Sequence, residues 1–313
     1  MIKVSAPGKL MLLGEHAVLN GHSCLVAAIN KRIFVETAFN NKKKVNIFSE
    51  EFGEYSIGIC DVLKTQNFET NKNFKFVLSA VKTILSSEQG VDIKISSEFP
   101  SNFGLGSSAA LTVATVHSLS VLFNLSLSKQ QVFQKSYKSV FNAQGKLGSG
   151  FDIAASTFGG ILLYSKQKGV IKQFTNLDFI INAVYSGYKI PTPEVIKIIQ
   201  TKENVAPEKY KLIYNRIGDL VDKGIECLKQ KNWENFGKVL NDNQVLLEQL
   251  GASDSTLDYI VQKLQSDPNI YGAKLSGSGL GDCAIGIGKQ NLNKLQNFQV
   301  LNLKIDTQGV QRC

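Results

Sequence analysis

A segment rich in glycine and serine, Pro100–Ala110, constrains the fold of this chain more than any other. It follows alternating apolar residues at 91–98, typical of a strand, and leads into an apolar stretch at 107–123, typical of a helix buried on most sides. Glycine lets the backbone approach a ligand, and the first N–H groups of a helix point outward with the positive end of its dipole behind them. The segment therefore predicts an anion site, or alternatively a plain turn in which Ser107 or Ser108 caps the helix.

This loop differs from the common phosphate-binding P-loop because it lacks the GK[ST] ending. The hydroxyl of Ser108 is a candidate ligand for Mg²⁺, an ion that keeps several waters and takes few protein ligands.

A second segment places single charged or titratable residues in apolar surroundings. Lys9, Glu15 and His16 interrupt an otherwise apolar pair of strands. Buried charges need a partner or a ligand, so these side chains are candidate site residues. The plainer alternatives are a surface lysine and a histidine with an ordinary hydrogen bond.

Two further glycine-rich segments are candidates for the same site. Asp152 ends a glycine-rich turn before an apolar stretch, a position suited to accepting a hydroxyl proton, although such a residue is often a helix cap. Residues 274–283, KLSGSGLGDC, predict a loop between two strands that could close over a substrate, or a plain turn.

Composition excludes several classes of protein. The chain has 313 residues, enough for two domains, and 43% of them are hydrophobic, which is typical of a globular protein. The net charge of +9 is dispersed and no nucleic-acid motif accompanies it, so we expect no nucleic-acid partner and a solvated loop at Lys42–Lys44. The five cysteines lack CxxC spacing and are expected to be reduced thiols. Without a signal peptide or a long apolar run, we expect a cytoplasmic protein with no membrane segment.

Helical and strand patterns are interleaved along the chain. Strand patterns at 2–37, 45–60 and 91–98 surround a helix pattern at 74–88, and a strand near 160–164 is followed by a polar stretch that marks a candidate domain border. The later part predicts four amphipathic helices and three strands, at 193–201, 208–229, 233–249, 254–266, 273–275, 283–287 and 301–305.

Taken together, PGKLMLLGEHAVLNG, PSNFGLGSSAA and KLSGSGLGDCAIGI resemble the three motifs of the GHMP kinases, and the resemblance covers nearly the whole chain. The GEHAV motif, the compact length and the late segment NFGKVLNDNQVLLEQLGASDSTLDYIV are most similar to mevalonate kinases of the short archaeal and bacterial type.

The resemblance implies an α+β fold, with a ribosomal-protein-S5-like N-terminal domain over 1–168 and a ferredoxin-like C-terminal domain over 169–313. It also implies ATP between the domains and a small-molecule substrate, and it allows a homodimer. The implied ATP-binding residues are Gly104, Leu105, Gly106, Ser107, Ser108 and Ala109, with Ser108 also on Mg²⁺. The implied catalytic residues are Asp152 and Lys9, and those facing the acceptor are Glu15, His16, Gly277, Ser278 and Gly279.

In this reading Asp152 accepts the proton of the acceptor hydroxyl, while Lys9 keeps the carboxylate ionised and stabilises developing charge. The usual acidic Mg²⁺ ligand about ten residues before the catalytic aspartate is missing at Val140–Ala143, so the second ligand is not identified.

The acceptor has two candidates. The first is mevalonate. The second is 5-phosphomevalonate, because AQGKLGSGFDIAAS and the aspartate of GLGDC look closer to phosphomevalonate kinases. A phosphorylated acceptor would need extra cations, for which Lys146, Lys31 and Arg32 are candidates. A remote alternative is a GHMP-fold protein that binds ligand without transfer.

Overall fold

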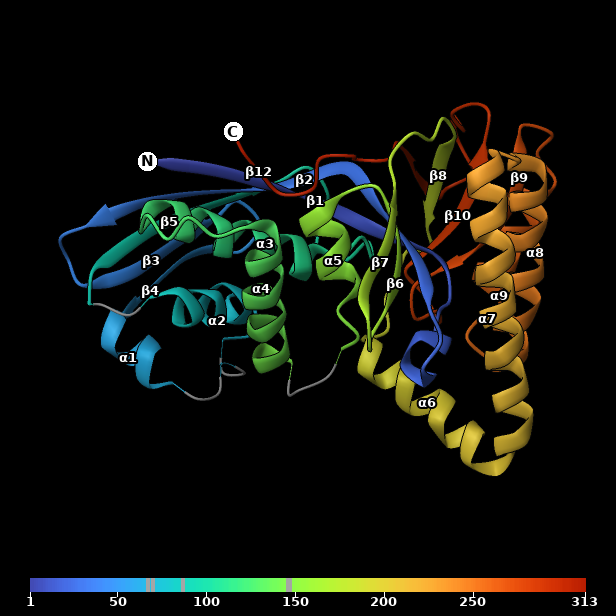
Figure 1. Ribbon diagram of the computed structural model, residues 1–313, viewed down its shortest axis with the longest axis horizontal. Helices are drawn as coiled ribbons and strands as arrows, with labels where there is room; N and C mark the ends of the chain where they lie inside the picture. Colours follow the sequence, from blue (N-terminus) through green and yellow to red (C-terminus); the bar gives the residue numbers. More distant parts are fainter. Residues whose placement is uncertain (66–67, 69–70, 86–87, 145–147) are drawn as a thin grey trace.

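The computed structural model describes residues 1–65, 68, 71–85, 88–144 and 148–313. Figure 1 shows a larger sheet with helices on one side of it, and beside it a smaller sheet that is also covered by helices. Strands and helices are interleaved in the first part of the chain and segregated in the second, as the patterns predict.

The larger sheet contains eight strands. Six of them follow the order β12-β1-β2-β5-β3-β4, while β6 pairs with residues 24–27 at the start of β2, and β7 pairs with β6. All neighbours are antiparallel except β3 and β5. Its strands are β1 (Ile2–Leu13), β2 (Cys24–Asn40), β3 (Lys44–Ser49), β4 (Gly53–Gly58), β5 (Gly90–Ser97), β6 (Ile161–Ser165), β7 (Gly169–Phe174) and β12 (Gln311–Arg312).

The alternation predicted at 91–98 decides which face of this sheet is covered. In β5, Val91, Ile93 and Ile95 are buried, whereas Asp92 and Lys94 are exposed. Because successive side chains of a strand point to opposite faces, one face of the sheet is apolar and needs a cover of helices. The helices of this half are α1 (Ile59–Lys64), α2 (Lys75–Ile84), α3 (Ser107–Leu122), α4 (Lys129–Ala143) and α5 (Phe151–Phe158), and a short 3-10 helix, η1 (Ala17–Asn20), follows β1.

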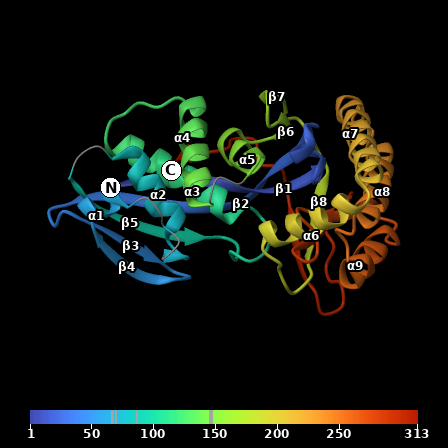
Figure 2. The same ribbon diagram turned by 90° about the horizontal axis from the view of Figure 1, so that it is seen from below.

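Helix α3 lies at the centre of this cover, in contact with β1 and β2 and with helices α2, α4 and α5 (Figures 1 and 2). Its side chains are buried all round, including Thr112, Thr115 and Ser118, whose hydroxyls form hydrogen bonds. This confirms the predicted buried helix. Its first turn consequently has a fixed position in the core, which matters for the site described below.

The smaller sheet is antiparallel, in the order β11-β8-β10-β9. Helices α8 and α9 pack on β9, and α7 packs on α8. The elements are β8 (Ile180–Tyr185), α6 (Thr192–Val205), α7 (Pro207–Gln230), α8 (Trp233–Leu250), α9 (Ser255–Gln265), β9 (Ile270–Ser276), β10 (Cys283–Gly288) and β11 (Gln299–Leu303). The four predicted helices and three predicted strands of this half are confirmed.

The end of the chain returns to the first sheet. Strand β12 pairs with the start of β1, and Cys313 N–H donates to the carbonyl of Lys3 at 2.9 Å. The predicted domain border at residue 168 falls inside the β6–β7 hairpin, between two strands that pair with each other. The larger sheet thus extends beyond residue 168 and regains residues 311–312.

The described part of the chain contains no helix of sufficient length and apolar character to cross a membrane. All five cysteines are free thiols in the structure, as predicted.

One guanidinium holds the returning tail in place, and its loss should be costly. Arg32 forms an ion pair with Asp306 and donates to the carbonyls of Ser5 and Gly309 at 3.1 and 2.7 Å. Because both charged side chains are about nine-tenths buried, Arg32→Met should lower the free energy of unfolding by roughly 3 kcal/mol in urea denaturation. Lys42→Met, in an exposed loop, serves as the control; equal stability of the two variants would contradict this role of Arg32.

Candidate active site

The phosphate loop, defined here as residues 104–109, ends at the first turn of α3. The N-cap of α3 is Gly106, in a left-handed conformation with φ 77°, and no side chain caps the helix. This excludes the alternative in which Ser107 or Ser108 is the cap. The first N–H groups of α3 therefore have no side-chain partner. They are hydrogen-bond donors that an anion could accept from.

Lys9 is fastened to this loop and is not a surface lysine. Only 8% of the residue is exposed. Its N–H donates to the carbonyl of Leu105 at 2.8 Å, and its Nζ donates to the carbonyl of Gly104 at 3.2 Å. A Cβ atom on Gly106 would lie 2.6 Å from Cγ of Lys9, so glycine is needed for this close approach.

Asp152 lies in the first turn of α5, half-buried, close to Lys9. The N-cap of α5 is Gly150, and Oδ1 of Asp152 accepts a hydrogen bond from the N–H of Ile153 at 2.9 Å. Burial lowers the pKa of the Lys9 ammonium, and the carboxylates of Asp152 and Asp282 act in the opposite direction. The ring of Phe151 lies 5.6 Å from Lys9 Nζ. The two predicted catalytic residues thus lie near enough for their charges to interact.

Glu15 is only 1% exposed, and its carboxylate binds other side chains of the protein. It forms a buried ion pair with Lys274 of β9, and its Oε2 accepts from Nδ2 of Asn243 at 3.2 Å. Its neighbour His16 is also buried, and Nε2 lies 2.9 Å from the carbonyl of Ser278. Burial lowers the pKa of the His16 imidazole, while this hydrogen bond and the charge of Glu15 oppose that effect.

The glycine-rich loop 277–281 joins β9 to β10. It contacts His16, which follows β1 of the larger sheet, and Thr192, which begins α6. The Ser278 hydroxyl is 3.4 Å from that of Thr192, at the start of α6. A Cβ atom on Gly279 would lie 2.0 Å from the carbonyl of Ala252. The loop is therefore packed against the C-terminal helices and presents Ser278 to the motif that contains His16.

Two lysines near these residues were not predicted as site residues. Lys274 stands in a strand that is otherwise apolar, and an isolated lysine there was a usable signal for a buried partner. Lys189 follows β8, and its Nζ lies 3.3 Å from Oδ1 of Asp282. Nothing in its local sequence, SGYKIP, distinguishes it from a surface lysine.

A hollow of about 430 Å³ opens beside the phosphate loop. It combines aromatic side chains with amide, hydroxyl and carboxylate groups, a mixture suited to a flat heterocycle with polar edges. Its lining includes Phe52, Asn73, Phe74, Phe99, Ser107 and Leu111.

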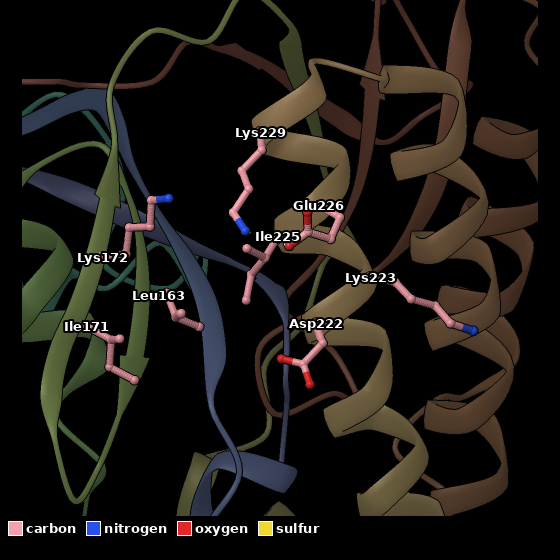
Figure 3. Close-up of a pocket in the computed structure, with 8 residues that line it drawn as sticks. All are labelled: Leu163, Ile171, Lys172, Asp222, Lys223, Ile225, Glu226 and Lys229. Carbon is pink, nitrogen blue, oxygen red and sulfur yellow. Dashed lines mark hydrogen bonds and ion pairs between the residues drawn. The ribbon is translucent and has the colours of Figure 1, made fainter.

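A second hollow, of about 590 Å³, lies away from the predicted site residues, between the β6–β7 hairpin and α7 (Figure 3). Leu163, Ile171 and Ile225 form its apolar wall, and Lys229 extends over it from α7. None of the predicted site residues is among those that line it.

Both halves of the chain match known protein families. Residues 74–160 match the family model "GHMP kinases N terminal domain", and residues 225–298 match "GHMP kinases C terminal". Residues 2–38 match a galactokinase galactose-binding signature. The mevalonate kinase of Pyrococcus furiosus is 31% identical to the chain, over 89% of this chain and 86% of that protein.

Solved structures give the same result. The chain resembles the Methanococcus jannaschii mevalonate kinase with a TM-score of 0.84 and 26% identity, covering 97% of this chain and 98% of that one. Streptococcus pneumoniae phosphomevalonate kinase, with a TM-score of 0.78 and 20% identity over 97% and 100% of the two chains, shares the fold. The family matches and the fold together define an ATP-dependent small-molecule kinase. The chain belongs to the GHMP kinase family, and the predicted α+β class is confirmed.

The close contact between Gly106 and Lys9 predicts a strong effect of one added methyl group. Gly106→Ala should lower kinase turnover by roughly 10²-fold, because the loop or the lysine must shift. Gly53→Ala is a matched control, since Gly53 has the same φ of 77° but nothing within 4 Å of an added Cβ. Steady-state kinetics of the two variants test this. Equal turnover in both would mean that the contact does not constrain catalysis.

Proposed function

We propose that this kinase transfers the terminal phosphoryl group of ATP to the 5-hydroxyl of mevalonate, forming 5-phosphomevalonate and ADP. The observation that carries the proposal is the attachment of Lys9 to the phosphate loop at the uncapped first turn of α3, with the Asp152 carboxylate near enough to interact with the charge of Lys9. A phosphate-binding helix end, a cation and a candidate proton acceptor are thus found in one small region. Close relatives named mevalonate kinase support the choice of acceptor.

The nucleotide phosphates would bind at residues 104–109, where backbone N–H groups and the helix dipole favour negative charge. The adenine base would enter the adjoining hollow that Ser107 helps to line, between Phe52 and Phe99. This arrangement directs the terminal phosphate toward Lys9 and Asp152. The protein then contributes mainly position and charge, as phosphoryl transfer requires.

Asp152 would accept the proton of the acceptor hydroxyl as the new bond to phosphorus forms, and ADP would leave with the electron pair of the broken bond. Lys9 would neutralise charge that develops on the transferred group. Gly277, Ser278, Gly279 and His16 would line the acceptor side. Glu15 would act through His16, because its own oxygens are bound to Lys274 and Asn243.

The residues at the site fit Mg²⁺. Among the described residues there is no group of three or more His, Cys, Asp or Glu side chains able to hold a metal ion. Mg²⁺ commonly binds to nucleotide phosphates and water with only one or two protein oxygens, and the half-buried Ser108 hydroxyl is such a donor at the helix end. Bound Mg²⁺ would neutralise phosphate charge. Removing it with EDTA should abolish transfer, and adding Mg²⁺ back should restore it.

The distribution of charge favours mevalonate over a phosphorylated acceptor. Lys9 is accompanied by the carboxylate of Asp152, which opposes its positive charge at the acceptor side. Arg32, a candidate cation for a second phosphate, is bound to Asp306. Lys31 precedes it in β2, and Lys146 lies outside the described residues. 5-Phosphomevalonate nevertheless stays the second candidate because Asp282 resembles the corresponding residue of phosphomevalonate kinases.

A coupled assay that offers mevalonate and 5-phosphomevalonate separately decides between them. We expect kcat/KM to be greater for mevalonate. A greater value for 5-phosphomevalonate would reverse the assignment, and ATP binding without transfer to either acceptor would indicate a ligand-binding protein. A cytoplasmic location and a homodimer stay predictions.

Replacing Asp152 by Asn tests the proton acceptor. The amide cannot take the proton, so turnover should fall roughly 10²-fold or more, with little change in ATP affinity. Asp222→Asn, on α7 beside the second hollow, should leave turnover unchanged. Turnover close to that of the unaltered enzyme in Asp152→Asn would remove this residue from the mechanism.

A further inference from the structure

A second lysine–aspartate pair lies against the phosphate loop. Asp282 follows the glycine-rich loop 277–281, and its Oδ1 is 3.3 Å from Nζ of Lys189. A Cβ atom on Gly104 would lie 2.7 Å from Cγ of Asp282, so the carboxyl group packs directly on the first glycine of the phosphate loop. The pair therefore lies where a ligand bound to that loop would be within reach.

The backbone joins the two residues into one unit. The N–H of Asp282 donates to the carbonyl of Tyr188, and the N–H of Ser186 donates to the carbonyl of Asp282, both at 2.9 Å. Asp282 has a φ of 61°, a left-handed conformation that aspartate adopts more readily than most residues other than glycine.

The two side chains differ in exposure. The Asp282 side chain is 6% exposed, whereas that of Lys189 is 35% exposed. Burial raises the pKa of the Asp282 carboxyl, and the charges of Lys189 and Lys9 oppose this effect. The buried carboxylate is thus an orienting group, and the ammonium is the group that can meet a ligand.

We propose that Lys189 binds a phosphate oxygen of the nucleotide as a second cation of the site, and that Asp282 is the residue that positions it. The assignment rests on the proposed function. It favours the nucleotide over the acceptor, because Asp282 contacts Gly104 of the phosphate loop. Lys9 and Asp152 would serve the reacting hydroxyl, while Lys189 would hold the phosphate chain.

Calorimetric binding of the non-hydrolysable ATP analogue AMP-PNP, with Mg²⁺ and without acceptor, tests the proposal. Lys189→Met should weaken binding roughly tenfold, the effect of losing one charge-assisted hydrogen bond. Lys189→Arg should retain affinity within about threefold, and adenosine should bind equally well to all variants. Lys229→Met is the matched control, since Lys229 is also an exposed lysine paired with a carboxylate, Glu226, but lies in α7.

Kinetics separate a positioning role from a structural one. Asp282→Asn should raise KM for ATP several-fold, with a smaller change in KM for mevalonate and an unchanged thermal midpoint of unfolding. If Lys189→Met binds AMP-PNP as tightly as the unaltered protein, or if it raises only KM for mevalonate, the proposal is wrong. Failure of the unaltered protein itself to bind AMP-PNP would instead contradict the proposed function.

Discussion

A buried ion pair determines how the two halves of this kinase meet. Glu15, just after β1, and Lys274, in β9, are 1% and 0% exposed, and Asn243 of α8 completes the shell. Burial lowers the pKa of Lys274, whereas the charge of Glu15 acts in the opposite direction. Taking both charges out of water is costly, and either residue alone would be a buried charge without compensation. The pair therefore favours one relative arrangement of the two sheets.

Further contacts join the same two segments along β9 and just after it. Ser276, two residues after Lys274, exchanges hydrogen bonds of 3.1 and 3.0 Å with the backbone of Met11, and Ser278 meets His16. The residues at 274, 276 and 278 thus all contact the segment that contains Lys9. Because Lys9 is fastened to the phosphate loop, the geometry of the glycine-rich loop 277–281 is transmitted to the first turn of α3. The site is consequently a product of both halves of the molecule.

Patterns of neighbouring residues predicted the features of the fold that depend on neighbouring residues alone. The alternation in β5 and the all-round burial of α3 are visible in the residues themselves. Helix α4 escaped prediction, although Ser128 and Gln131 form a capping box that was readable in the sequence. Lys189 and the partner of Glu15 could not be found in this way, because their contacts join residues about 90 and 260 positions apart and depend on the packing of the two sheets.

The return of the tail to β1 has a consequence for synthesis on the ribosome. The edge of β1 that accepts β12 stays open until residues 311–312 have emerged, and Arg32 has no Asp306 until then. During translation the edge of β1 therefore stays unpaired while the second sheet and its helices are synthesised, because β12 follows all of them in the chain. Because Cys313 N–H donates to the carbonyl of Lys3, residue 313 lies beside the first residues of β1, and the closing contact joins the two most distant parts of the sequence.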